Sequence, residues 1–64
     1  MASKDKQYVF RWKEGNAEVP RSRSTDRDAV WWYAAHWLRP ASLDDTEGEK
    51  YVREHGEVVE WSPE

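Results

Sequence analysis

The stretch QYVFRWK, residues 7–13, decides the fold of this chain. Aromatic residues occupy every second position, Tyr8, Phe10 and Trp12, while Val9 is the one apolar residue among the positions that alternate with them. Because successive side chains of a β-strand point to opposite faces, this pattern predicts a strand with its three aromatic residues on one side.

A hairpin is expected directly after this strand. Gly15 and Asn16 tolerate the positive φ that a tight hairpin loop requires, and residues 17–19 favour a second strand. Pro20 has no amide hydrogen to donate, so this second strand must lie at the edge of the sheet or end early.

The following segment predicts a long helix. We expect it to begin at Asp26, because Thr25 and Asp28 have the spacing of a capping box, and to end at residue 38 or 39, because Pro40 cannot continue a helix. At the helical period, a broad sector of roughly 200° holds the apolar residues Ala29, Val30, Trp31, Tyr33, Ala34, Trp37 and Leu38. Opposite this sector lie Asp28, Trp32, His36 and Arg39. Since Trp31 and Trp32 are adjacent, we expect at least one of the two rings to face a cover, a partner or water.

A short second helix and a third strand complete the expected fold. Thr46 and Glu49 have capping-box spacing, and Gly56 stands where a left-handed helix C-cap is typical, which predicts a helix of about nine residues. Residues 57–61 then favour a strand. The sequence predicts an α+β domain over residues 7–61, of order β-β-α-α-β, in which one long and one short helix pack on a three-stranded antiparallel or mixed sheet. Residues 1–6 are expected to form a flexible polar leader, and residues 62–64 a tail.

The composition limits how such a domain can be stabilised and where it works. The chain has 64 residues, no cysteine and five tryptophans. Neither disulfides nor thiolate metal sites can support the single core that this length allows, so we expect the tryptophans to supply much of the cohesion. The longest apolar run, residues 29–35, is far shorter than the roughly 20 residues of a membrane helix, and residues 1–7 do not resemble a signal peptide. We therefore expect a cytoplasmic protein with no membrane contact.

Catalysis and metal binding are not expected. His36 and His55 fall on separate predicted elements and have no HExxH-type spacing. No serine has a GxSxG setting, the three glycines are scattered, and a chain this small is poorly suited to enclosing a water-excluded pocket. The sequence predicts a non-enzymatic protein without metal or cofactor.

Charge is distributed unevenly along the chain. Residues 1–39 hold eight Lys or Arg against five Asp or Glu, a net of +3, and residues 40–64 hold two against eight, a net of −6, which together give −3. The two halves can neutralise each other in the folded domain, or the acidic segment can face a basic partner.

We expect the chain to act by binding another protein. An exposed tryptophan ringed by polar groups is typical of an interface hot spot, and an acidic segment can steer association with a basic surface. The residues expected to form this protein-binding surface are Asp28, Trp32, His36, Arg39, Asp44, Asp45 and Glu47. A small acidic protein of this kind is an accessory or regulatory module, and it can act as an inhibitor by covering a basic groove on a larger enzyme.

Two alternatives remain open at this stage. Arginines beside exposed aromatics can bind single-stranded nucleic acid, for which the residues would be Arg11, Lys13, Arg21, Arg23 and Arg27, although the negative net charge opposes it. The wide apolar sector of the long helix and the edge strand could instead be covered in a homodimer.

Overall fold

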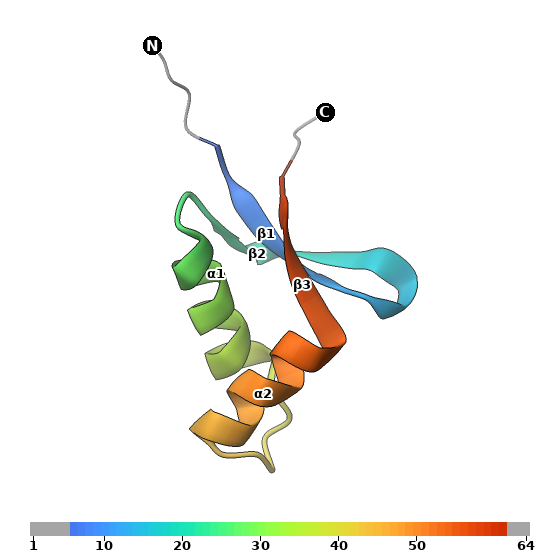
Figure 1. The fold of residues 1–64 in the computed structure, drawn as a ribbon, viewed down its shortest axis with the longest axis vertical. Coiled ribbons are helices and arrows are strands. Elements are labelled where there is room, and N and C mark those ends of the chain that lie inside the picture. Colours follow the sequence, from blue (N-terminus) through green and yellow to red (C-terminus); the bar gives the residue numbers. More distant parts are fainter. Residues whose placement is uncertain (1–5, 62–64) are drawn as a thin grey trace.

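Residues 6–61 of the computed structural model form a three-stranded antiparallel sheet with two helices on one face (Figure 1). The elements are β1 (Tyr8–Trp12), a 3-10 turn (Glu14–Asn16), β2 (Ala17–Ser24), α1 (Arg27–Tyr33), the π-helical turn η2 (Ala34–Leu38), α2 (Asp45–His55) and β3 (Gly56–Glu60). The predicted α+β class and the order β-β-α-α-β are confirmed, and β1 lies in the centre of the sheet, between β2 and β3. Apart from Lys6, the predicted leader and tail fall outside the residues that the structure describes.

The core lies between β1 and the helices. The aromatic side of β1 faces the helices, and Phe10 is fully buried in a cluster with Val30, Ala34 and Val52. Phe10 contacts Trp12 and Trp31 edge-to-face, with ring centroids 4.8 and 5.9 Å apart. Such aromatic pairs add to the stabilisation that comes from buried area alone.

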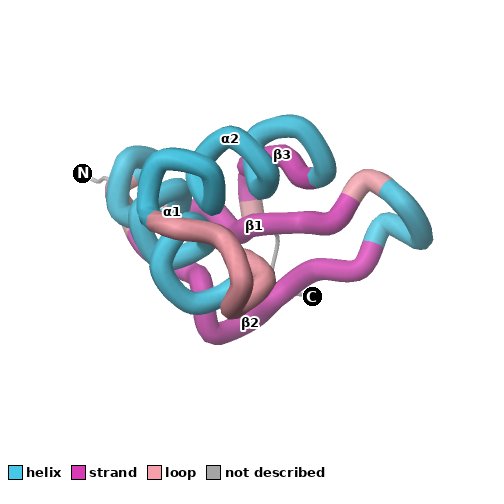
Figure 2. The backbone as a smooth tube through the Cα atoms, turned by 90° about the horizontal axis from the view of Figure 1, so that it is seen from below, coloured by secondary structure: helices cyan, strands magenta, loops and turns pink. Residues whose placement is uncertain are grey.

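The hairpin between β1 and β2 turns where the sequence predicts. Gly15 and Asn16 have φ angles of 82° and 53°, in the left-handed region that these two residue types tolerate best. The tip of this hairpin extends beyond the helical layer (Figure 2).

The second strand is longer than expected and contains a large bulge. Tyr8 pairs with Ser24 and Phe10 with Val19, so four residues of β2 lie opposite Val9 alone. Within the bulge, Ser22 Oγ accepts a hydrogen bond from the Phe10 amide (2.8 Å) and donates one to the Val19 carbonyl (2.7 Å). The expectation of an edge position for this strand is confirmed, but the strand does not end at Pro20, because the bulge accommodates the missing amide hydrogen.

The sheet face away from the helices carries polar and cationic contacts. Arg11 forms an ion pair with Glu57 at 2.6 Å, and the Arg23 guanidinium lies 4.1 Å from the Trp61 ring centroid. The Arg23–Trp61 contact joins β2 to the residue that follows β3, and Val9 of the central strand is fully buried.

Both helices begin with caps other than the predicted ones. Asp26, and not Thr25, caps α1 by accepting the Asp28 amide (3.0 Å). Asp44 and Glu47 form the capping box of α2, and the predicted pair of Thr46 and Glu49 does not. Asp26 directly follows the predicted Thr25, and Asp44 lies two residues before the predicted Thr46. In both helices the aspartate is the N-cap, since its carboxylate is also favoured by the helix dipole. The second helix therefore has eleven residues, where about nine were predicted.

The long helix does not stay α-helical. After Tyr33 it continues as the π-helical turn η2, in which backbone bonds join residues five positions apart. Trp37 lies within this turn and is 65% exposed, although the regular period predicted it in the apolar sector. Ala29 of the same sector is also exposed, because it lies in the first turn of α1. Trp31 packs against the core, whereas Trp32 does not.

Gly56 joins α2 to β3 without an intervening loop. Its φ of −140° is extended, so the predicted left-handed cap is wrong. A Cβ at this position would overlap the ring of Phe10. Glycine is required here because the core aromatic approaches the backbone closely.

Candidate protein-binding surface

The outer side of α1 and η2 carries a continuous group of aromatic rings. Trp32 and Trp37 are 62% and 65% exposed, and His36 lies between them in the chain. The rings of Trp32 and His36 are stacked, 4.6 Å apart and 11° from parallel. His36 meets Trp37 at 6.0 Å, and Tyr33 lies 6.5 Å from Trp37. We call Trp32, Tyr33, His36 and Trp37 the aromatic face.

Spacing along the helix explains how these rings come together. Trp32 and His36 are four residues apart, as are Tyr33 and Trp37, and side chains at this spacing are neighbours on a helix surface. The sequence placed Trp32 opposite the apolar sector and left open whether that ring is covered. It placed Trp37 in the apolar sector, although the structure leaves this ring exposed within η2.

A groove of about 210 Å³ lies beside Trp32, between α1 and α2. Its lining residues are Asp28, Trp31, Trp32, Ala35, Glu49 and Arg53. Arg53 is held in place by Glu49 at 3.2 Å and lies 4.6 Å from the Trp31 ring centroid. The Arg53 charge is therefore balanced within the chain, whereas Asp28 has no ion-pair partner among residues 6–61.

Arg39 and Asp45 connect the end of η2 to the start of α2. Arg39 pairs with Asp45, and its aliphatic carbons fill the space that a Cβ at Gly48 would need. The hydrogen bond from Arg39 and its charge lower the pKa of Asp45 below the usual value, and His36 contributes to the same effect. The start of α2 thus lies within electrostatic range of the aromatic face.

The predicted binding residues divide into two groups. Asp28, Trp32 and His36 lie on the outer side of α1 and η2, and the other four lie at the start of α2 or just before it: Arg39, Asp44, Asp45 and Glu47. Within the second group, the structure also gives each residue an internal role. Asp44 accepts the Glu47 amide at 2.8 Å, and the Glu47 carboxylate lies 3.4 Å from the Asp44 amide.

The predicted nucleic-acid residues come from β1, β2, the hairpin between them and α1. Arg11 and Arg23 are engaged on the sheet face away from the helices. Arg27 lies at the start of α1, 5.6 Å from the Tyr8 ring centroid, and Lys13 follows β1 at the hairpin. Arg21 is exposed in the bulge of β2. Arg27 lies apart from the strand residues because it begins α1.

Two further findings concern the described part of the chain. Within residues 6–61, no three His, Cys, Asp or Glu side chains converge as metal ligands would. Over the same residues, the helices are too short and too polar to cross a membrane.

Comparison with known proteins provides no relative. No protein-family model, curated protein or solved structure matches this chain.

Proposed function

We propose that this protein is a small non-catalytic interaction module that docks on the basic surface of a larger protein through the aromatic face and the acidic start of α2. The observation that carries the proposal is the exposure of Trp32 and Trp37, at 62% and 65%, on one side of one helix. Covering one such ring is favourable by on the order of 3 kcal/mol, and tryptophan is among the residues most enriched in binding hot spots.

The charges around the aromatic face favour a basic partner. Arg39 and Arg53 are both paired with carboxylates of α2, so they add little net positive charge. Asp28, Asp44 and Glu47 have no cationic partner among residues 6–61. A surface of exposed indoles bordered by uncompensated carboxylates complements a partner that offers an apolar patch surrounded by lysine or arginine.

Partner capture with matched variants tests this proposal. The double variant Trp32→Ala/Trp37→Ala should keep the Tm of the wild type, because both rings are exposed, and should lose the partner that the wild type retains. Lys50→Ala, an exposed change on α2, serves as the control and should keep that partner. Equal retention by the wild type and the double variant would exclude the aromatic face. A partner whose affinity does not fall with added salt would exclude the acidic contribution.

Single-stranded nucleic acid remains the second candidate, because the stacked Trp32 and His36 rings form a platform on which a base could stack. The carboxylates around the platform oppose it. Tryptophan fluorescence should therefore not respond to mixed-sequence oligonucleotides at low salt. Saturable quenching that weakens steeply with salt would replace the protein-docking proposal with this one.

A further inference from the structure

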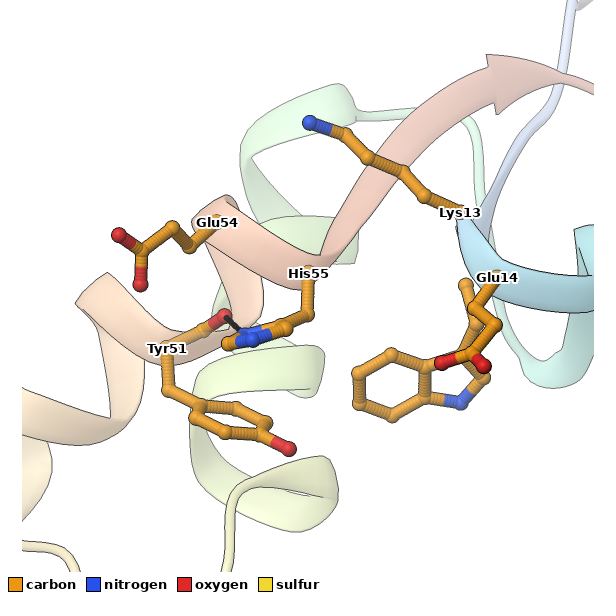
Figure 3. Close-up of a pocket in the computed structure, with 6 residues that line it drawn as sticks. Lys13, Glu14, Tyr51, Glu54 and His55 are labelled. Carbon is orange, nitrogen blue, oxygen red and sulfur yellow. Dashed lines mark hydrogen bonds between the residues drawn. The ribbon is translucent and has the colours of Figure 1, made fainter.

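A second recess lies away from the aromatic face, where the end of β1 meets the end of α2. It has a volume of about 310 Å³ and is lined by Trp12, Lys13, Glu14, Tyr51, Glu54 and His55 (Figure 3). The proposed function uses none of these residues. We call this recess the β1–α2 pocket.

Two aromatic walls of the β1–α2 pocket meet nearly at a right angle. The Trp12 and Tyr51 ring centroids are 6.5 Å apart, with 73° between the ring planes. A cation in the corner between them can lie within about 6 Å of both centroids, the range of a cation–π interaction. The His55 ring lies against one face of Tyr51, at 4.2 Å and 31° from parallel, so a cation would use the other face of Tyr51.

The backbone fixes these walls in position. The Lys13 amide donates to the His55 carbonyl at 3.0 Å, and Trp12 pairs with Gly56 across the β1–β3 ladder. The Nδ1 atom of His55 lies 3.0 Å from the Tyr51 carbonyl oxygen, which orients the imidazole on the last turn of α2. A ligand would therefore meet a preformed site and lose little free energy to ordering it.

The polar groups at the rim favour a positive charge. Among residues 6–61, no ion pair engages the carboxylates of Glu14 and Glu54. In Figure 3 the Glu14 carboxylate lies on the hairpin side of the pocket, across from Tyr51, while the Lys13 ammonium group points away from the Tyr51 hydroxyl. Two carboxylates and one ammonium group, that of Lys13, thus border the aromatic corner, which leaves an excess of negative charge at the rim.

We propose that the β1–α2 pocket binds an alkylated ammonium group, the side chain of a trimethylated lysine. An unmodified ammonium group is strongly hydrated. It therefore loses more hydration free energy than a trimethylated group does when ring faces replace the water around it. The quaternary charge keeps its attraction to the ring faces and to Glu14, and its methyl groups fill an apolar corner. This site is independent of the docking proposed for the aromatic face.

An NMR titration tests the pocket with defined probes. Choline, the trimethylammonium probe, should shift the Trp12 indole signal and the amide signals of Lys13, Glu14 and His55. Its neutral isostere 3,3-dimethylbutan-1-ol has the same shape without the charge. This compound should not shift the same indole and amide signals. Equal shifts with both compounds, or none with choline at millimolar concentration, would overturn the proposal.

Variants separate the contributions of charge and ring. Glu14→Gln should weaken choline binding about two- to fivefold, the effect of one exposed charge, whereas Glu18→Gln on β2 removes the same charge elsewhere and should have no effect. Tyr51→Leu should abolish choline binding, with the remaining amide spectrum showing that the fold persists. If Glu14→Gln binds choline as tightly as the wild type, the Glu14 carboxylate does not contribute to the site.

A last comparison identifies the source of the ammonium group. Trimethyllysine should bind more tightly than phosphocholine, because the phosphate of phosphocholine would approach the carboxylates at the rim. Tighter binding of phosphocholine would assign the pocket to a lipid headgroup and overturn the trimethyllysine proposal. The double variant Trp32→Ala/Trp37→Ala should bind choline normally, so the two proposals can fail separately.

Discussion

At the residue scale, Ser22 replaces a missing strand partner. Its hydroxyl is the hydrogen-bond acceptor for the buried Phe10 amide, and the side chain is only 2% exposed. Ser22→Ala should lower the free energy of unfolding by about 1–3 kcal/mol, because the Phe10 amide loses its acceptor. Urea unfolding measures this loss. Ser42→Ala, at an exposed position, is the control and should change stability by less than about 0.5 kcal/mol.

Gly56 provides a second prediction at this scale. Gly56→Ala should destabilise the fold by about 1–3 kcal/mol or more, because its Cβ would enter the space of the Phe10 ring. Gly56→Asn distinguishes this steric overlap from a requirement for a left-handed backbone, because asparagine tolerates positive φ. If the overlap is the cause, thermal unfolding should show that Gly56→Asn lowers stability at least as much as Gly56→Ala. A mild effect of Asn with a severe effect of Ala would point to the backbone instead.

At the element scale, Gly48 determines how α2 packs against the end of η2. In an isolated helix, Gly48→Ala would be favourable by up to about 1 kcal/mol. Here the new Cβ would collide with the Cβ and Cδ atoms of Arg39 and displace this side chain from Asp45. We expect Gly48→Ala to lower the Tm. A rise in Tm would show that Arg39 moves aside without loss.

The ion pair of Arg39 and Asp45 gives the contact between η2 and α2 a pH dependence. The pKa of Asp45 is lowered from 3.8 in the folded state, mainly by Arg39, so folding favours the charged carboxylate. The resulting stabilisation is present above pH 3.8 and is lost as the pH falls through the lower folded value. Asp45→Asn should therefore have a slightly lower Tm than the wild type at neutral pH.

The difference in Tm between Asp45→Asn and the wild type should narrow once the pH falls below 3.8. Glu18→Gln, with no ion-pair partner among residues 6–61, provides the comparison for general charge effects. A difference that stays constant with pH would mean that the Asp45 charge does not act through Arg39.

At the scale of the whole molecule, we expect a monomer. The edge strand β2 contains Pro20 and a bulge, and the other edge strand, β3, carries Glu57 and Glu60, features that discourage pairing between sheet edges. The net charge of −3 adds a weak repulsion between copies. Light scattering at high micromolar concentration should give a mass near 7.6 kDa. A measured mass of twice this value would indicate a homodimer, with a second copy of the chain covering the aromatic face.

Local patterns were sufficient to predict the elements and their order. The alternation in residues 7–13 predicted β1 and placed its three aromatic residues on one side, because the period of a strand is independent of its surroundings. Gly15 and Asn16 predicted the hairpin, and Pro40 predicted where the long helix ends, since the allowed φ angles and the missing amide are properties of these residues themselves. The helical period placed Trp32 opposite the apolar sector, but only the structure showed that Trp31 packs against the core and Trp32 is exposed.

Only the tertiary structure decided the features that depend on distant segments. Trp37 is exposed within η2, although the regular period placed it in the apolar sector. The Ser22 hydroxyl accepts the Phe10 amide because β1 passes beside the bulge, and Gly56 is required because Phe10 packs against it. The β1–α2 pocket joins residues some forty positions apart. The sequence by itself therefore determined the α+β order and the alternation of β1, through backbone preferences and apolar period. The aromatic face and the pocket were decided by packing between elements, where side chains far apart in the chain occupy neighbouring space.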